Sequence, residues 1–294
     1  MFWCFCAVLV LAAPSPAQGS PTAASSGKPA RGTDMLAAAG RLTQSIQKGS
    51  QISLTSPSSG IPEEAAMPVK DLNPAHYPAR RAAIVAQHFL NTQHSSPCKL
   101  FLLDAISSAT LQETEEKGNK YKLEFSLKDA VSNQSVGPCS AEVQFPSRGE
   151  EGAPLVQYSC QGLSAVNTTD QEESFYRRLR DSGSLVTAND IPDSYGHMAP
   201  EMKPLWRLGA AAASFIMLKE SNESTLYNVA QVTNIMQQES EGDQLKFRYH
   251  ILLHDMVSQE IIPWVLLFTW SPAEGVRVLS AEKQPRCPHG TASS

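Results

Sequence analysis

The chain has 294 residues, of which 41% are hydrophobic, and it carries a formal net charge of −5 at pH 7. This length is enough for two domains of ordinary size, and the acidic balance argues against nucleic acid as the main partner. Beyond the first residues, the longest apolar run (205–218) is too short to span a membrane and contains Arg207. We therefore expect a globular protein with no membrane span and no nucleic-acid partner.

The first residues predict an exported chain. Residues 1–13 are almost wholly apolar and Ser15-Pro16-Ala17 offers small residues for cleavage, a pattern typical of a secretory signal peptide over residues 1–17. A buried core helix is the alternative. Residues 18–76 are rich in Ser, Ala, Pro, Gly and Thr, and they have too little apolar surface to offset the cost of ordering the backbone. We therefore expect a flexible arm ahead of a secreted, extracellular protein.

The first domain is predicted over residues 77–165. Pro78 suits a first helical turn, and apolar residues then recur at helical spacing until Ser95, which predicts one long helix. Four candidate strands follow, and the second and third alternate apolar with polar residues. They are expected at residues 99–109, 121–128, 139–145 and 154–160.

Cysteine spacing predicts one disulfide in this domain. Removal of the leader would leave Cys98, Cys139, Cys160 and Cys287, and an even number is usual in secreted chains. If the last turn is centred between residues 149 and 150, Cys139 faces Cys160 with a Cα separation of about 4.5–5.5 Å, within the range of a disulfide. Two buried free thiols are the alternative. Spacing does not decide whether Cys98 pairs with Cys287.

The second half of the chain repeats this plan. Residues 168–179 predict a connecting helix, acidic early and basic late as the helix dipole favours, within a helix and linker at 166–190. The second domain (191–283) opens with an apolar helix from Pro204, whose Gly209 would permit close approach to a sheet, and a tail follows at 284–294. Its strands are expected at residues 226–236, 245–253, 261–270 and 276–280.

Two of these strands are the most apolar part of the domain. Residues 245–253 alternate apolar with polar side chains, as a half-buried strand does, whereas residues 261–270 are nearly unbroken apolar, as in a strand buried on both faces. The short polar stretch between them predicts a hairpin. The predicted fold class is therefore α+β, with two tandem domains, each a long helix on a four-stranded antiparallel sheet, joined by a connecting helix.

No catalytic or cofactor motif is found along the chain. Motifs of zinc proteases, serine hydrolases and phosphate-binding loops are absent from the sequence. His250 and His254 fall on one face of a strand at a separation of about 13 Å, which is too far for one metal ion. We therefore expect no enzyme activity, no metal and no cofactor. Three sequons make Asn133, Asn167 and Asn222 candidate N-glycosylation sites.

Longer stretches resemble one family. They keep their order from about residue 76 to residue 279, and they read HYPARRAAIVAQHF (76–89), CSAEVQFPS (139–147), SFYRRL (174–179), IPDSYGHMAPEM (191–202) and ILLHDMVSQEIIPW (251–264). On these stretches the chain resembles the latexin family. The resemblance implies two cystatin-like domains joined by a helix. It also implies inhibition of A-type zinc metallocarboxypeptidases by covering the rim of the active-site funnel. The leader, arm and sequons favour the secreted branch, with the avian eggshell protein ovocalyxin as the expected nearest relative.

The contact with the protease is expected at one hairpin tip. Our candidates are Ser258, Gln259 and Glu260 at the turn, flanked by His254 and Trp264. Such a surface needs to be rigid and needs no catalytic group. The alternative is that the turn is merely well formed and that Trp264 belongs to the core.

Two functions remain open at this point. The first is a secreted metallocarboxypeptidase inhibitor, extended to a protective or antimicrobial role in an extracellular matrix such as eggshell. The second is a structural protein of a mineralised matrix or barrier layer, which binds matrix components and has lost inhibition. Strongly acidic runs would favour contact with mineral, and the sequence has none.

Overall fold

The computed structural model describes residues 68–113, 118–147, 149–150, 152–239 and 242–285. The predicted leader (1–17), the predicted arm up to residue 67 and the tail from residue 286 onward, with Cys287, lie outside the described residues. Within the ranges given, no helix combines the length and the apolar character that crossing a membrane requires.

The first domain is one long helix on an antiparallel sheet. Helix α1 (Tyr77–His94) begins and ends where the sequence predicts, and the four expected strands all form. The sheet has a fifth strand, which the prediction placed in the flexible arm. In spatial order the strands are β1 (Val69–Asp71), β2 (Phe101–Gln112), β3 (Lys120–Asp129), β4 (Ser135–Gln144) and β5 (Leu155–Cys160). Strand β1 gave no signal because it is only three residues long and all three are exposed at the sheet edge.

The register of β4 and β5 is the predicted one. Ala141 faces Tyr158, Val143 faces Val156, and Cys139 faces Cys160. The two cysteines form a disulfide, with their Cα atoms 4.1 Å apart. The position of the turn fixes which residues face each other, and this register brings the two thiols together.

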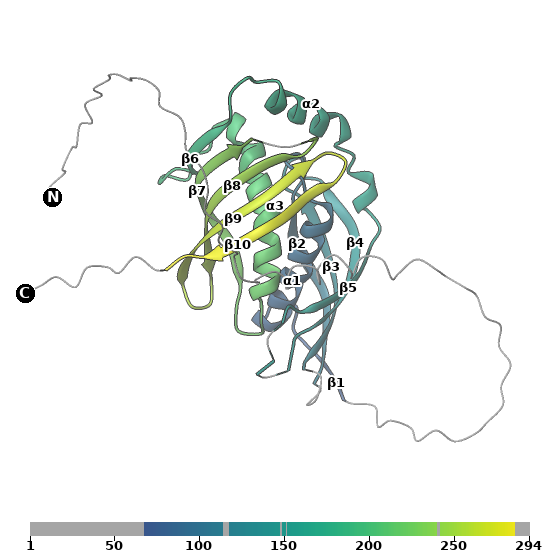
Figure 1. Cartoon of the computed structure of the whole chain (residues 1–294). Helices are drawn as coiled ribbons and strands as arrows, with labels where there is room; N and C mark the ends of the chain where they lie inside the picture. The colour runs from purple at the N-terminus through teal and green to yellow at the C-terminus, as the bar shows by residue number, and fades with distance from the viewer. Residues whose placement is uncertain (1–67, 114–117, 148, 151, 240–241, 286–294) are drawn as a thin grey trace, which may run out of the picture. The chain divides into compact units, whose positions relative to one another are not determined.

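The second domain has the same plan. Helix α3 (Lys203–Glu220) lies against the second sheet (Figure 1), which again has five strands. In spatial order they are β10 (Gly275–Lys283), β9 (Glu260–Ser271), β8 (Leu245–Asp255), β7 (Tyr227–Gln238) and β6 (Thr187–Ile191). The four-stranded prediction is wrong here too, because β6 lies in the stretch assigned to the linker. This edge strand is mostly exposed and polar, and it carries no apolar alternation.

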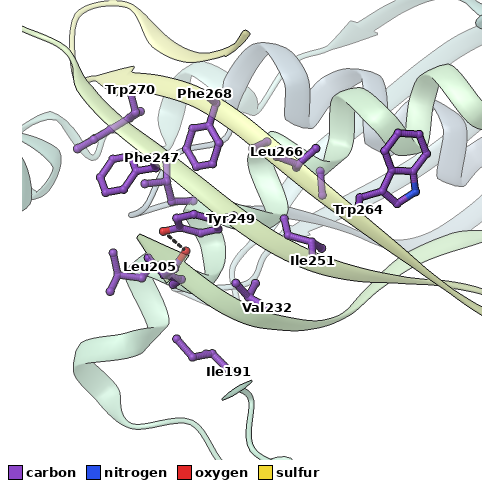
Figure 2. Packing of buried hydrophobic residues seen from close by; sticks show 14 of the residues in the cluster. Ile191, Leu205, Val232, Phe247, Tyr249, Ile251, Trp264, Leu266, Phe268 and Trp270 are labelled. Atoms are coloured by element: carbon purple, nitrogen blue, oxygen red, sulfur yellow. Dashed lines mark hydrogen bonds between the residues drawn. The ribbon is translucent and has the colours of Figure 1, made fainter. Parts of the chain in front are cut away.

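Strands β8 and β9 hold the core of this domain. Phe247, Tyr249 and Phe268 are fully buried, with ring centroids 5.0 Å apart for Tyr249 and Phe268, and Figure 2 shows them between the strands and α3. The prediction that β9 is buried on both faces holds only in part. On the face turned away from the core cluster Val265 is buried, but Leu267 and Thr269 are half-buried and Ile261 is exposed.

Close packing of α3 on the sheet depends on Gly209, as the sequence predicts. A Cβ at this position would lie 2.9 Å from Cδ2 of Tyr249 and 3.2 Å from Cγ2 of Val232, which is too close for carbon atoms. The Tyr249 hydroxyl, on the same ring, donates a hydrogen bond to the carbonyl of Leu205 (3.2 Å; Figure 2). The missing side chain lets the helix and the buried tyrosine touch.

The two domains are related by an offset of 126 residues. Lys203–Glu220 lies 126 positions after Tyr77–His94, and Tyr227–Gln238 lies 126 positions after Phe101–Gln112. The register shifts in β2 recur in β7 at the same offset. The chain is therefore a structural repeat down to single-residue irregularities of its strands.

The interface between the domains follows the same offset. Helices α1 and α3 pack against each other. The Arg81 guanidinium donates to the carbonyl of Glu223, and Arg207, 126 positions after Arg81, donates to the carbonyl of Pro97 (2.6 Å). Each domain thus gives the other the same contact, as in a two-fold symmetric dimer.

Helix α2 (Thr169–Arg180) connects the domains, as predicted. Its Phe175 and Leu179 belong to the core of the second domain. On the other side, the carboxylate of Glu172 accepts a hydrogen bond from the Ser96 hydroxyl (2.7 Å) of the first domain. The connecting helix is therefore bonded to both domains.

Candidate protein-contact surface

The predicted contact site is the turn between β8 and β9, here called tip 2 (Asp255–Glu260). One carboxylate oxygen of Asp255 accepts hydrogen bonds from the amides of Leu226 (2.9 Å) and Val257 (3.1 Å), and the other accepts from the Ser258 hydroxyl (2.7 Å). Gln259 has a left-handed backbone, with φ of 61°. Asp255 thus fixes the turn and ties it to the start of β7.

The charge of Asp255 is kept by these bonds. Burial raises the pKa of its carboxyl, but the hydrogen bonds from Leu226, Ser258 and Val257 act in the opposite direction and together hold the pKa below its usual range. The group is therefore a carboxylate at neutral pH, and its charge strengthens each bond that it accepts.

The structure separates the predicted contact residues into two groups. Ser258 and Gln259 are exposed, and His254 and Glu260 are half-buried at the base of the tip. Trp264 is only 7% exposed and belongs to the core, so its ring is not presented to a partner.

The prediction missed the exposed apolar side chains of this region. Met256 and Val257 are each 42% exposed and the adjoining Ile261 is 46% exposed. The sequence pattern places Met256 and Val257 in the short polar stretch between two strands. Asp and Ser residues are common in turns, so the position of Met256 and Val257 between Asp255 and Ser258 indicates that both side chains lie in an exposed turn.

A second tip has the same construction. Tip 1 (129–134) joins β3 and β4, and Asp129 accepts hydrogen bonds from the Leu100 amide (3.2 Å) and from the Ser132 hydroxyl (2.7 Å). Asn133 has φ of 58°, and Val131 is 47% exposed. The signal in the sequence was the repeat of Asp-x-Val-Ser at an offset of 126 residues, which we missed.

One cavity lies between the domains; Met256 of tip 2 lines it directly, and tip 1 is joined to its lining through Leu100. The cavity has a volume of about 250 Å³ and is lined by residues of both domains, among them Ile84, His88, Leu100, Trp206, Leu226 and Met256. Leu100 is bonded to Asp129 of tip 1, and Leu226 is bonded to Asp255 of tip 2. Each tip is therefore bonded to a residue of the cavity lining, and we call the two tips together with this lining the tip surface.

A buried histidine lies in the wall of this cavity. His88 of α1 is 2% exposed, and its Nε2 hydrogen-bonds to the carbonyl of Tyr227 in the other domain (3.2 Å). Burial lowers the pKa of His88 to about 4, although the bond to Tyr227 acts in the opposite direction. At neutral pH the ring is therefore neutral and donates its Nε2 proton across the domain interface.

The remaining chemical candidates do not gather into a site. Across the described ranges, no three His, Cys, Asp or Glu side chains come together as a metal ion would require. Burial lowers the pKa of His250 and the charge of Arg248 adds to this effect. Cys98 has a free thiol, and its possible partner Cys287 lies outside the described residues, so this pairing stays open.

All three sequon asparagines are exposed. The side-chain oxygen of Asn167 accepts a hydrogen bond from the Thr169 hydroxyl (2.8 Å), and that of Asn222 accepts one from the Ser224 hydroxyl (2.7 Å). Asn133 lies on tip 1. The folded chain therefore has room for a glycan at each position, and only the glycan at Asn133 would stand on the tip surface.

Such a duplicated helix-on-sheet chain, with two rigid turns held by their aspartates, has an architecture suited to binding another protein. Comparison with known proteins identifies the family. The latexin family model matches residues 72–288. Mouse latexin is 35% identical over 216 residues, covering 74% of this chain and 97% of that protein. The chain belongs to the latexin family, whose members are protease inhibitors and not enzymes.

Two further relatives bear on the predictions. Chicken ovocalyxin-32 is 28% identical over 211 residues, covering 71% of this chain and 76% of that protein. This identity is lower than the 35% of mouse latexin, so the expectation that ovocalyxin is the nearest relative is not supported. Among solved structures, mouse fetuin-B covers 74% of this chain at 12% identity with a TM-score of 0.26, which is too low to carry an argument.

Proposed function

We propose that this protein is a secreted inhibitor of A-type zinc metallocarboxypeptidases, which it blocks by laying the tip surface over the mouth of the active-site funnel. The proposal is supported by membership of the latexin family, whose members inhibit carboxypeptidase A. The observation that carries it to these residues is the pair of matching rigid turns, each bonded through its aspartate to a residue that lines one cavity.

The area required favours two tips over one. A stable interface buries about 800 Å² on each partner, contributed by about 20–30 residues. A single turn of six residues would supply only about a quarter of that area. The two tips and the cavity rim together come much closer to the required area. The two tips are also fixed before binding, tip 1 by Asp129 and tip 2 by Asp255. Little ordering entropy is then lost on association.

The exposed apolar side chains of the two tips suit this role. Val131, Met256, Val257 and Ile261 are each more than two-fifths exposed, and the structure keeps them in water although each would gain by burial. Ser258 and Gln259 add exposed polar groups on tip 2, and the half-buried His254 precedes it. An apolar centre with a polar rim is the usual composition of a protein contact.

Secretion is part of the proposal. It is supported by the apolar residues 1–13 and by the Cys139–Cys160 disulfide, since disulfides persist mainly in oxidising compartments. A protective role in an extracellular matrix would follow from inhibition of a protease there. No described feature favours the purely structural matrix role, so we do not propose it.

Titration against two enzymes tests this function. We expect the purified, unglycosylated chain to inhibit an A-type carboxypeptidase at one-to-one stoichiometry, because one tip surface covers one funnel. A B-type enzyme, assayed in parallel with its own basic substrate, shows whether the block is selective. Inhibition of the B-type enzyme alone would contradict the A-type assignment, and inhibition of neither would contradict the proposed function.

A further inference from the structure

We propose that an N-glycan on Asn133 covers part of the tip surface and weakens inhibition of the protease. This inference rests on the proposed function, and it concerns the regulation of the same site. Of the three sequons, only the one at Asn133 lies on a tip. Asn133 lies at the apex of tip 1. Before it stands Ser132, whose hydroxyl donates to Asp129, and after it β4 begins at Ser135, which pairs with Lys128 of β3.

The backbone of tip 1 holds this asparagine in a fixed position. The amide of Asn133 donates to the carbonyl of Asp129 (2.8 Å), and the amide of Asp129 donates to the carbonyl of Gln134 (2.9 Å). Asn133 and the sequon residue Ser135 are both exposed. A glycan attached here would therefore start from a rigid point at the rim of the proposed contact and not from a mobile loop.

A glycan at this place opposes binding for two reasons. It is bulky and strongly hydrated, so it would have to be displaced or desolvated before a protein could approach. It also stands two residues from Val131, whose apolar side chain, 47% exposed, needs close contact to contribute to binding. Tip 2 has glutamine at the equivalent position, Gln259, and cannot be modified in this way.

The other two sequons provide matched controls. Asn167 precedes α2 and Asn222 follows α3, and their side-chain oxygens are engaged in local turns with Thr169 and Ser224. Neither asparagine belongs to a tip or lines the cavity. Glycans there would leave the tip surface uncovered, so the three sites separate a local block from a general effect of glycosylation.

The experiment uses the full chain secreted from a eukaryotic cell line. Site occupancy is measured by peptide mass spectrometry, and inhibition of an A-type carboxypeptidase is titrated for the parent and four variants. Asn133→Gln and Ser135→Ala each remove the sequon on tip 1, and the second keeps Asn133 itself. Glutamine is compatible with the left-handed backbone of Asn133 because Gln259 adopts it in tip 2, with φ of 61°. Asn167→Gln and Asn222→Gln are the controls.

We expect Asn133→Gln and Ser135→Ala to inhibit about 30-fold more tightly than the parent, or about 2 kcal/mol, with both controls equal to the parent. An unoccupied Asn133 in the secreted parent overturns the inference, as does unchanged inhibition when the glycan is lost. In either case the proposed function stands if the chain inhibits. If no variant inhibits, Ser135→Ala included, the proposed function itself is contradicted and the inference falls with it.

Discussion

The double substitution Gln259→Ala, Glu260→Ala is expected to weaken inhibition of an A-type carboxypeptidase about 100-fold. That loss corresponds to about 2.7 kcal/mol, a typical effect for side chains near the centre of an interface. Gln259 is exposed at the apex of tip 2, and Glu260 lies beside it at the start of β9. Inhibition constants of the unglycosylated parent and the variant give the result.

The fold is expected to tolerate this change. Alanine and glutamine both carry a Cβ, so the backbone strain at φ of 61° is similar for both. The variant loses the hydrogen bond from the Gln259 side chain to the Met256 carbonyl, worth about 1 kcal/mol. Thermal unfolding should therefore show a small shift only. A matched pair, Gln171→Ala with Glu173→Ala on α2, removes the same residue types away from both tips and should leave inhibition unchanged. Parental inhibition by the tip 2 variant would remove Gln259 and Glu260 from the contact.

Acidification from pH 7 to pH 4.5 is expected to cost about 2 kcal/mol of unfolding free energy through His88 alone. Its pKa is about 4 in the folded chain against the ordinary 6.5, so the folded state resists the proton that the unfolded state accepts. This contribution is complete above pH 6.5 and is lost as the pH falls from 6.5 towards 4. Protonation would also bury a proton on Nδ1, which has no partner among the described residues.

A comparison with His88→Gln isolates this effect. Denaturant unfolding at pH 7 and pH 4.5 gives the loss for each protein, and we expect the variant to lose about 2 kcal/mol less than the parent. Other groups cancel in the difference. Hydrogen bonds hold the pKa values of Asp129 and Asp255 low against the opposing effect of burial, so both carboxylates lower stability in acid in the two proteins alike. Equal losses in parent and variant would show that His88 does not carry this pH dependence.

The long elements of the fold were predictable because each has a strong period. The apolar spacing of α1 and the alternation in β3 and β8 determine their type, and the position of the turn between β4 and β5 brings Cys139 to Cys160. Strands β1 and β6 were not predictable in this way. They are short, exposed edge strands that are stabilised by pairing with a neighbour and contribute little apolar surface of their own.

The candidate site shows a second limit of sequence patterns. Ser258 and Gln259 were correctly expected at the surface, since they follow an alternating strand at a turn. Trp264 belongs to the core, because in β9 a position's face is set by its pairing with β8, where it stands opposite the buried Ile251. The match between tip 1 and tip 2 is weak in the sequence, because only four residues repeat after 126 positions. The structure shows that the two tips are equivalent, since Asp129 and Asp255 accept the same backbone hydrogen bond.

Amide hydrogen exchange, measured on the unglycosylated chain alone and in its one-to-one complex with an A-type carboxypeptidase, tests most directly whether the two tips form one contact. The account predicts slower exchange in the complex at residues 129–135 and 255–261 together, with the exposed turn at 193–197 unchanged. Slower exchange at that turn or at the sheet edges, with both tips unaltered, would contradict it.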